Sequence, residues 1–267
     1  MHKREKTMTR EDLLPYADKF EAYVNKFVTP ISYDKGGDNG ALCGTGAFVS
    51  KEDRIYLITN VHVISGLEKI SEEKKSPVFP QCLFKEGEEF VPIKVSFKKS
   101  DIAVDVAMAD ITDIWNAQEL NDRNAIAIER FKSTEKIEGE YFYTVGYLSF
   151  DARMEGDTLK CPMQKFLTTE DELPNIDGKE FFPYCQFALK YSPEHCYYTR
   201  TEMHLCSDPR GLSGSLVWNT HLTDEVIMNH QEWNPELMTV AGVEFFWDER
   251  NVLVCSKSEA IDFNNLM

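Results

Sequence analysis

The sequence predicts an all-β protein with a single helix at its N-terminus. Helical periodicity is confined to the first 28 residues, and from there the apolar residues form short runs separated by turn residues. Helical segments do not alternate with these runs, which favours an antiparallel barrel or sandwich over an α/β fold. The 267 residues, 42% hydrophobic and 28% charged, are sufficient for one large globular domain or two small ones.

Residues 9–28 are predicted to form one amphipathic helix. Thr9 is a suitable N-cap, with Asp12 in the place of the capping-box glutamate, and Pro15 either starts the helix or lies in its first turns. We expect this helix to pack on the rest of the protein, and a partner-binding helix is the alternative. Its apolar face comprises Leu13, Ala17, Phe20, Val24, Phe27 and Val28.

The predicted strands follow one another along the rest of the chain. A turn-rich loop spans Asp34–Gly40, and Lys51–Arg54 is typical of a tight turn between two strands. The polar stretch Glu135–Glu140 is a candidate junction between two halves, and Asn219–Pro235 is a candidate loop insertion. Strands are expected at Gly46–Val49, Ile55–Thr59, Phe90–Phe97, Val104–Ala109, Tyr141–Gly146, Gly214–Trp218 and Met238–Phe246.

The charge balance restricts the partners of the protein. Asp and Glu number 45 against 29 Lys and Arg, and the net charge of −16 repels nucleic-acid phosphates and anionic lipid. We therefore expect no nucleic-acid partner and no membrane partner. No apolar run in the sequence is long enough to cross a bilayer.

The cysteines indicate a reducing compartment. Their number is odd, their spacing is scattered, and no apolar core follows the basic residues 1–6 as it would in a secretory signal. We expect free thiols and a cytoplasmic location. Histidines accompany three cysteines between residues 185 and 206, but their spacing fits no common zinc site, so we expect no metal. The cysteines are Cys43, Cys82, Cys161, Cys185, Cys196, Cys206 and Cys255.

Three short patterns carry candidate chemistry, and the first two supply a histidine and a carboxylate. His62 lies at the end of the apolar run 56–64, where a strand can hold it toward a cleft, although a lone histidine there is more often structural. Asp105 lies at the start of the apolar run 106–109, and a buried carboxylate needs a partner such as an imidazole N–H. Asp101 opens a similar run and is the less favoured choice, because it would leave Asp105 inside the strand.

The third pattern places Ser213 among glycines at the entrance to a strand. Gly211 and Gly214 permit backbone conformations that direct neighbouring N–H groups at one point. Such groups stabilise a developing oxyanion by about 3–4 kcal/mol per donor. Taken alone, this pattern fits a simple glycine-rich turn as well as it fits an oxyanion-binding turn.

Together the three patterns occur in the order His, Asp, Ser and resemble the chymotrypsin-like (trypsin-fold) serine peptidases. The resemblance covers roughly residues 28–262, and it looks closest to the intracellular bacterial branch, similar to the HtrA peptidase domain without its PDZ domain. It implies two antiparallel β-barrels, over residues 28–135 and 136–267, that follow the N-terminal helix of residues 1–27 and hold the active site between them. The matching motifs are GTGAFVS, LITNVHVI, DVAMADI, VGY, GLSGSLVW and AGVEFF.

The resemblance implies a role for each candidate residue. Ser213 is expected as the nucleophile, His62 as general base and then general acid, and Asp105 as the group that orients the imidazole. The N–H groups of Gly211 and Ser213 are expected to form the oxyanion hole. The reaction so implied is acyl transfer to serine followed by hydrolysis, without a metal or cofactor.

The same resemblance places substrate-binding residues at Ser207, Asp208, Gly242 and Glu244. Two of them are acidic, so charge complementarity would favour a Lys or Arg side chain of the substrate. The alternative is that both carboxylates face solvent or pair with Arg210.

Departures from the family bear on regulation. Val63 and Pro209 replace cysteines of secreted members, which agrees with a reducing compartment. Leu212 replaces the aspartate that binds the freed N-terminus of zymogen-activated members, so we expect no activation of that kind. The function expected is a serine endopeptidase that acts on protein or peptide substrates, with a regulatory protein partner as a further expectation. The alternative is a catalytically silent trypsin-fold protein that acts as a protein-binding module.

Overall fold

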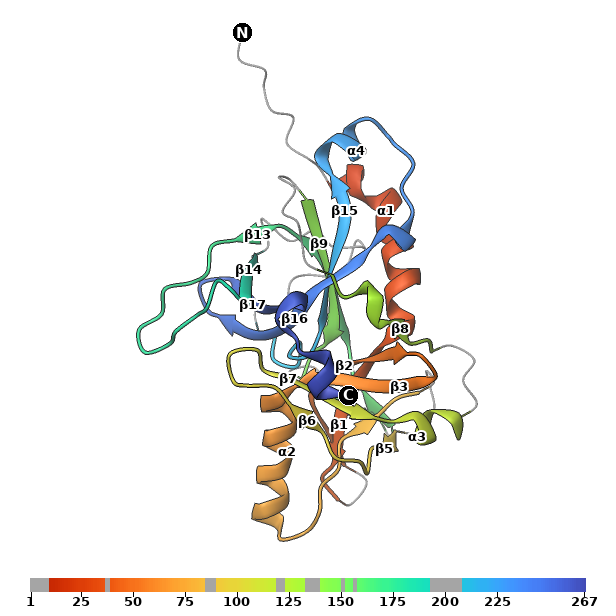
Figure 1. Ribbon diagram of the computed structural model, residues 1–267, viewed down its shortest axis with the longest axis vertical. Coiled ribbons are helices and arrows are strands. Elements are labelled where there is room, and N and C mark those ends of the chain that lie inside the picture. Colours follow the sequence, from red (N-terminus) through yellow and green to blue (C-terminus); the bar gives the residue numbers. More distant parts are fainter. Residues whose placement is uncertain are drawn as a thin grey trace.

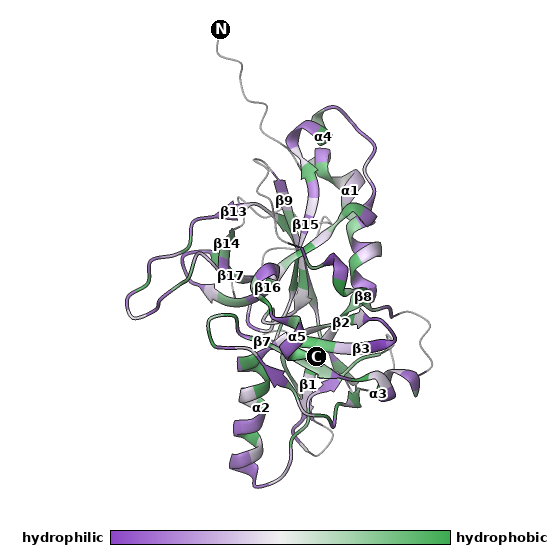
Figure 2. Cartoon of the chain, in the orientation of Figure 1, coloured by the Kyte–Doolittle hydropathy of each residue, from purple (hydrophilic) through white to green (hydrophobic). Residues whose placement is uncertain are grey.

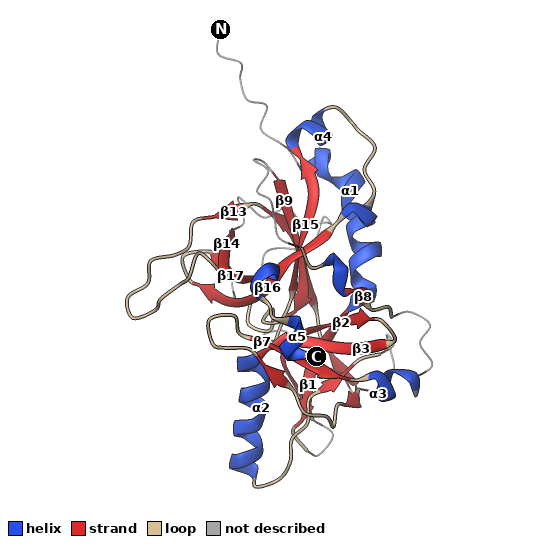
Figure 3. Cartoon of the chain, in the orientation of Figure 1, coloured by secondary structure: helices blue, strands red, loops and turns tan. Residues whose placement is uncertain are grey.

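The described residues form two large sheets of mostly antiparallel strands, the first from the N-terminal half and the second from the C-terminal half of the chain (Figure 1). The predicted mostly β architecture with an N-terminal helix is confirmed, and the helices lie outside the sheets or at their ends (Figure 3). The computed structural model describes residues 10–36, 39–84, 90–118, 123–132, 140–149, 152–155, 158–192 and 208–267.

The first sheet has the strand order β5-β4-β1-β2-β3-β7-β6, and β8 runs parallel beside β2. Only Val91–Pro92 of the strand predicted at 90–97 forms a strand, which pairs with β4, and the N–H of Ile93 adds one further hydrogen bond to the Pro80 carbonyl at 2.7 Å. The bounds of these strands are β1 Val28–Asp34, β2 Gly40–Lys51, β3 Arg54–Asn60, β4 Gln81–Cys82, β5 Val91–Pro92, β6 Lys98–Lys99, β7 Val106–Asp110 and β8 Ile126–Ala127.

The second sheet has the strand order β12-β9-β15-β16-β17-β14-β13, and a separate hairpin is formed by β10 and β11. Apolar residues concentrate along many of the strands (Figure 2), and one buried apolar cluster includes residues of both sheets. The bounds are β9 Glu140–Tyr147, β10 Arg153–Glu155, β11 Thr158–Lys160, β12 Met163–Thr168, β13 Glu170–Asp171, β14 Gln186–Lys190, β15 Leu216–Thr223, β16 Thr239–Asp248 and β17 Val252–Lys257.

The helices are short, and in the described part of the chain none is long and apolar enough to traverse a lipid bilayer. The α-helices are α1 Arg10–Val24, α2 Val61–Lys74, α3 Thr112–Asn116, α4 Asp224–Met228 and α5 Phe263–Leu266, and the 3-10 turns are η1 Asn25–Phe27, η2 Ile128–Arg130, η3 Pro235–Leu237 and η4 Ser258–Ala260.

Helix α1 packs on the second sheet. The ring of Phe20 stacks on Tyr143 with centroids 5.2 Å apart and meets the edge of Trp233 at 4.8 Å. Lys165 Nζ lies 2.7 Å from Glu21 Oε1, and both side chains are largely buried. The apolar face of the predicted helix is therefore covered by the protein's own core, as expected from its pattern.

Two segments differ from the sequence prediction. The strand predicted at Ile55–Thr59 is present as β3, but His62, expected where a strand holds it at the end of the apolar run, lies in the first turn of α2, which begins at Val61. The buried residues Val63, Ile64 and Leu67 of α2 have helical spacing, and this burial outweighs the β-branched composition. The predicted insertion 219–235 extends β15, contains α4 and is anchored by Trp233, whose indole N–H donates to the Thr220 carbonyl at 2.9 Å.

Candidate active site

His62 and Asp105 are bonded through their side chains and through a backbone group. His62 Nδ1 lies 2.6 Å from Asp105 Oδ2, and the backbone N–H of His62 donates to Asp105 Oδ1 at 3.0 Å. The Asp105 side chain is 9% exposed and that of His62 is 48% exposed, so the carboxylate is sealed while the imidazole reaches solvent. Because an ionised carboxylate only accepts hydrogen bonds, this contact assigns the proton of the neutral imidazole to Nδ1 and leaves Nε2 as an acceptor.

Two neighbouring strands bring this pair to one edge of the first sheet. β3 pairs with β7 in antiparallel register, and Asn60 lies opposite Val106. Val61, which follows β3, and Asp105, which precedes β7, therefore lie next to each other, and the N–H of Val61 donates to the Asp105 carbonyl at 3.1 Å. The side-chain amide of Asn60 donates to the same carbonyl at 2.8 Å.

The backbone of Asp105 is held in an unusual conformation. Its φ is 51°, a left-handed value that aspartate tolerates better than most residues. Its N–H donates to the Asp101 carbonyl at 2.9 Å, and Asp101 Oδ1 accepts hydrogen bonds from the N–H groups of Ala103 and Val104. Asp101 thus shapes the turn that leads to Asp105, and Asp105 is the carboxylate that contacts His62.

A tight turn over Pro209–Leu212 precedes Ser213. It closes with a 3.0 Å hydrogen bond between its end residues and has Gly211, with a φ of 104°, at its third position, as a type II turn requires. The Arg210 carbonyl accepts hydrogen bonds from Ser149 N at 2.7 Å and Ser149 Oγ at 2.8 Å. Because the peptide bond is trans, the N–H of Gly211 points away from Ser149.

A second turn, over Leu212–Ser215, places Ser213 at its corner. It closes at 2.7 Å and has Gly214, with a φ of 92°, at its third position. A Cβ atom there would lie 2.0 Å from the Thr45 carbonyl oxygen, so no other residue fits. Within the described residues, the N–H groups of Gly211 and Ser213 are bonded to no acceptor, and both donors remain available.

Ser213 is held against the first sheet next to the segment that carries His62. The N–H of Thr45 donates to the Ser213 carbonyl at 2.8 Å. A Cβ atom on Gly44 would lie 3.0 Å from the Ser213 carbonyl oxygen and 2.8 Å from Val63 Cγ2, so Ser213 and the residue after His62 flank the same glycine. Over the part of the chain that the structure describes, Ser213 Oγ and His62 Nε2 share no direct hydrogen bond.

Two buried hydroxyl groups that the sequence pattern did not reveal hold this arrangement together. Thr45 Oγ1 donates to the Gly211 carbonyl at 2.7 Å and accepts from the N–H of Tyr147 at 2.9 Å. Thr59 Oγ1 donates to the Thr45 carbonyl at 2.7 Å. Both threonines are fully buried. The available signal was the GTG sequence, in which a hydroxyl stands between two glycines that permit close approach of another chain segment.

The residues expected to bind substrate have different environments. Ser207 lies outside the described residues, as do the histidines between residues 185 and 206. Asp208 is engaged by the guanidinium of Arg210, whose Nε lies 2.8 Å from Oδ1, and this bond holds the pKa of Asp208 below its usual value. Gly242 lies within β16, where a Cβ atom would be 2.1 Å from the Ser256 carbonyl oxygen.

Glu244 is the remaining expected substrate residue, and it is buried. The residue is only 2% exposed, and Oε2 of its side chain has no hydrogen-bond partner among the described residues. Burial, and then the charge of Asp105, raise the pKa of Glu244 to about 8. Glu244 is buried and Asp208 is paired with Arg210, so the structure gives no support to a preference for a basic substrate side chain.

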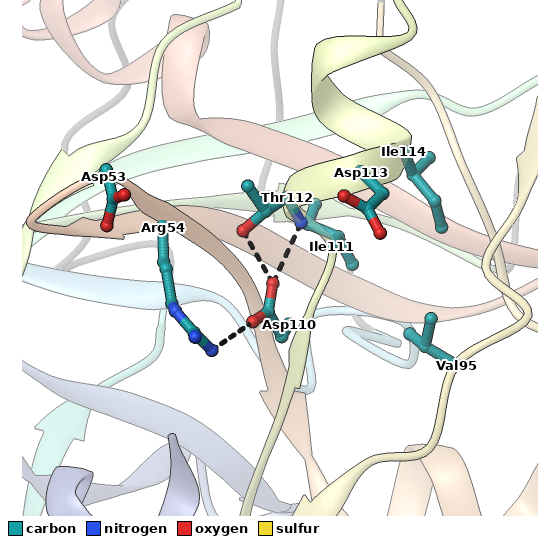
Figure 4. Close-up of a pocket in the computed structure, with 8 residues that line it drawn as sticks. All are labelled: Asp53, Arg54, Val95, Asp110, Ile111, Thr112, Asp113 and Ile114. Atoms are coloured by element: carbon teal, nitrogen blue, oxygen red, sulfur yellow. Dashed lines mark hydrogen bonds and ion pairs between the residues drawn. The ribbon is translucent and has the colours of Figure 1, made fainter.

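A cavity of about 340 Å³ lies at the opposite end of the first sheet (Figure 4). Arg54 and Asp110, which pair at 3.0 Å, occupy the ends of β3 and β7 that lie farthest from His62 and Asp105. Burial acts to raise the pKa of Asp110, but hydrogen bonds from Thr112 and the charge of Arg54 outweigh it and hold that pKa below its usual value. The cavity is therefore separate from the candidate active site.

Comparison with known proteins gives only similarity of fold. No family model matches the chain, and no curated protein matches it. A crystal structure of the MamO protease domain from Magnetospirillum magneticum, in the apo form, has a TM-score of 0.48 and 12% identity over 90% of this chain and 96% of that chain. A structure on the coupled folding and binding of the intrinsically disordered Sesbania mosaic virus VPg protein has a TM-score of 0.45 and 14% identity over 87% and 85%. We base the function on this chain's own residues.

Proposed function

We propose that the protein is a serine endopeptidase in which Ser213 is the nucleophile, His62 the general base and acid, and Asp105 the residue that orients His62. The observation that carries the proposal is the sealed His62–Asp105 pair, with Nδ1 and Oδ2 at 2.6 Å, beside the glycine turns that present Ser213. A buried carboxylate that fixes one imidazole tautomer leaves the other ring nitrogen ready to accept a proton.

The proton path follows from this tautomer. Ser213 Oγ attacks the scissile carbonyl carbon and forms the new C–O bond, while its proton passes to His62 Nε2 and the carbonyl oxygen takes the negative charge. Collapse of this intermediate breaks the C–N bond, and the leaving amine receives the proton from His62. Water then repeats the sequence on the acyl-enzyme and releases the second product. Asp105 stabilises the imidazolium in both halves of the reaction.

The N–H groups of Gly211 and Ser213, which donate to no acceptor among the described residues, support an oxyanion hole formed by these two residues. The bonds from Ser149 to the Arg210 carbonyl fix the plane of the Arg210–Gly211 peptide, and the hydrogen bond from Thr45 Oγ1 holds the next carbonyl. Both donors are therefore set before substrate binds. Donors that need no reorganisation contribute most to the stabilisation of a developing oxyanion.

Labelling with a fluorophosphonate probe tests the proposal, because the probe reacts covalently with an activated serine. We expect the wild type to be labelled and Ser213→Ala to be unlabelled. The matched control is Ser215→Ala, since Ser215 lies two residues away, is buried and has no hydrogen-bond partner for its hydroxyl within the described chain. That variant should be labelled like the wild type. Absence of labelling in a folded wild type would instead favour a catalytically silent protein-binding module.

A further inference from the structure

The turn that precedes Ser213 has a central peptide, between Arg210 and Gly211, that can face either of two ways. A type II turn and a type I turn share their end points and differ mainly by a half-rotation of this peptide. The φ of Gly211 is 104°, which matches the type II turn, but a glycine also adopts the negative φ of the type I turn without strain. Glycine at this position therefore leaves both orientations accessible to the turn.

The orientation of this peptide decides which group the turn presents beside Ser213. In the observed orientation the Arg210 carbonyl faces Ser149, and the N–H of Gly211 points to the other side, where it donates to no acceptor among the described residues. A half-rotation would exchange the two groups. A carbonyl oxygen would then stand where the N–H donor is needed, and it would repel a developing oxyanion.

Ser149 holds the Arg210 carbonyl in the observed orientation with two donors. Its N–H lies 2.7 Å and its Oγ 2.8 Å from the carbonyl oxygen. The segment that carries Ser149 follows β9 directly and is anchored by the N–H of Leu148, which donates to the Pro162 carbonyl at 2.9 Å. In the rotated turn both donors of Ser149 would lose this acceptor and face the N–H of Gly211, so rotation costs free energy.

Asp208 holds the same arginine from its other side. Its Oδ1 accepts from the N–H of Arg210 at 3.2 Å and from Nε of Arg210 at 2.8 Å. These bonds fix the start of the residue and its side chain, and neither of them reaches the peptide that follows. Within the described chain, Ser149 supplies the side-chain donor at the Arg210 carbonyl. The choice between the two orientations therefore depends on Ser149 and not on Asp208.

We propose that Ser149 is a positioning residue, whose hydroxyl selects the turn orientation in which the Gly211 N–H is free to bind the oxyanion. The side chain is half-buried and takes no part in the proton transfers between Ser213 and His62, so it acts through Gly211. This inference rests on the proposed function and adds to it the residue on which the competence of the oxyanion hole depends. Because the oxyanion develops only in the transition state, loss of the hydroxyl should lower kcat and leave substrate binding unchanged.

The first test observes the turn without requiring activity. Arg210–Gly211 is the one Arg–Gly pair in the sequence, so ¹³C-carbonyl arginine and ¹⁵N-glycine together give a single assigned amide signal. In full-length Ser213→Ala protein we expect a strong nuclear Overhauser effect between this N–H and Hα of Arg210, as in a type II turn, and a loss of its intensity when Ser149→Ala is added. Ser149→Thr keeps a hydroxyl and should keep the effect. The control is Ser71→Ala, which removes a half-buried hydroxyl bonded to a backbone carbonyl in α2. Equal intensities with and without the Ser149 hydroxyl would overturn the proposal.

The second test uses steady-state hydrolysis of a peptide amide, for which acylation limits the rate and KM reports substrate binding. We expect kcat of Ser149→Ala to fall about 3- to 10-fold, the effect of one hydrogen bond, with KM unchanged. Ser149→Thr should recover the wild-type kcat, and Ser71→Ala should keep it. An unchanged kcat in Ser149→Ala, or a change confined to KM, overturns the proposal. An inactive wild type contradicts the proposed function, while the nuclear Overhauser effect still decides the role of Ser149.

Discussion

Thr45 of β2 and Gly211 of the turn that precedes β15 are joined by a hydrogen bond of 2.7 Å from the threonine hydroxyl to the glycine carbonyl. The same hydroxyl accepts from the N–H of Tyr147, and the Thr45 N–H holds the Ser213 carbonyl. One buried residue of the first sheet therefore fixes the serine turn of the second sheet. The relative placement of His62 and Ser213 depends on this junction.

Asp105→Asn should nearly abolish probe labelling without unfolding the protein. An amide cannot accept hydrogen bonds at both positions from which Asp105 contacts His62, so the imidazole would lose its fixed tautomer. We expect the labelling rate to fall by about 10³–10⁴-fold. Asp101→Asn is the control, because Asp101 contacts backbone N–H groups and not His62. Equal losses in the two variants would contradict the assignment of Asp105.

Gly211→Ala should remove activity through the backbone. A Cβ atom there would lie 2.5 Å from both Ser149 N and the Tyr147 carbonyl oxygen, at a φ of 104° that disfavours any side chain. The turn must then change and the Gly211 N–H must move, and we expect the labelling rate to fall by about 10²–10³-fold. Gly36→Ala has a similar φ of 91° but meets nothing within 4 Å, so it isolates the effect of strain and should keep full labelling.

Glu244→Gln should change how stability depends on pH. The ordinary pKa of 4.5 is raised to about 8 in the folded protein, so the folded state holds the proton more tightly than the unfolded state. The stability that this proton contributes is complete below about pH 4.5 and is lost as the pH rises to about 8. In urea unfolding, the free energy of the wild type should fall relative to Glu244→Gln by at most about 1.4 kcal/mol per pH unit across that window. A constant difference would mean that Glu244 keeps an ordinary pKa.

Phe20→Ala should destabilise the whole protein, because α1 is part of the core. Phe20 is 1% exposed and packs against Tyr143 and Trp233. We expect a loss of about 3–5 kcal/mol in the free energy of unfolding, measured by chemical denaturation. The control is Leu237→Ala, since Leu237 is 56% exposed and should change stability by at most about 0.5 kcal/mol. A small effect of Phe20→Ala would mean that α1 can leave the core at low cost.

Much of the fold and part of the candidate site could be predicted from local pattern. The strands around the GTG motif, the N-terminal helix and the pair of His62 and Asp105 all have signals in short windows of sequence. The helix that starts at Val61 could not be predicted, because its apolar residues continue those of β3 and only tertiary burial separates the two. The burial of Glu244 was missed for a similar reason: an acidic residue in a strand gives no local sign of which neighbours enclose it.

The antiparallel register that sets Asn60 opposite Val106 has a consequence for how this protein can diverge. The histidine and its carboxylate are located by two strand ends and by the turn that Asp101 shapes before Asp105, and not by the long stretch of chain between α2 and that turn. Insertions and deletions within that stretch should leave the pair unchanged. A single inserted residue in either strand would separate the two groups, even in a molecule that still folds.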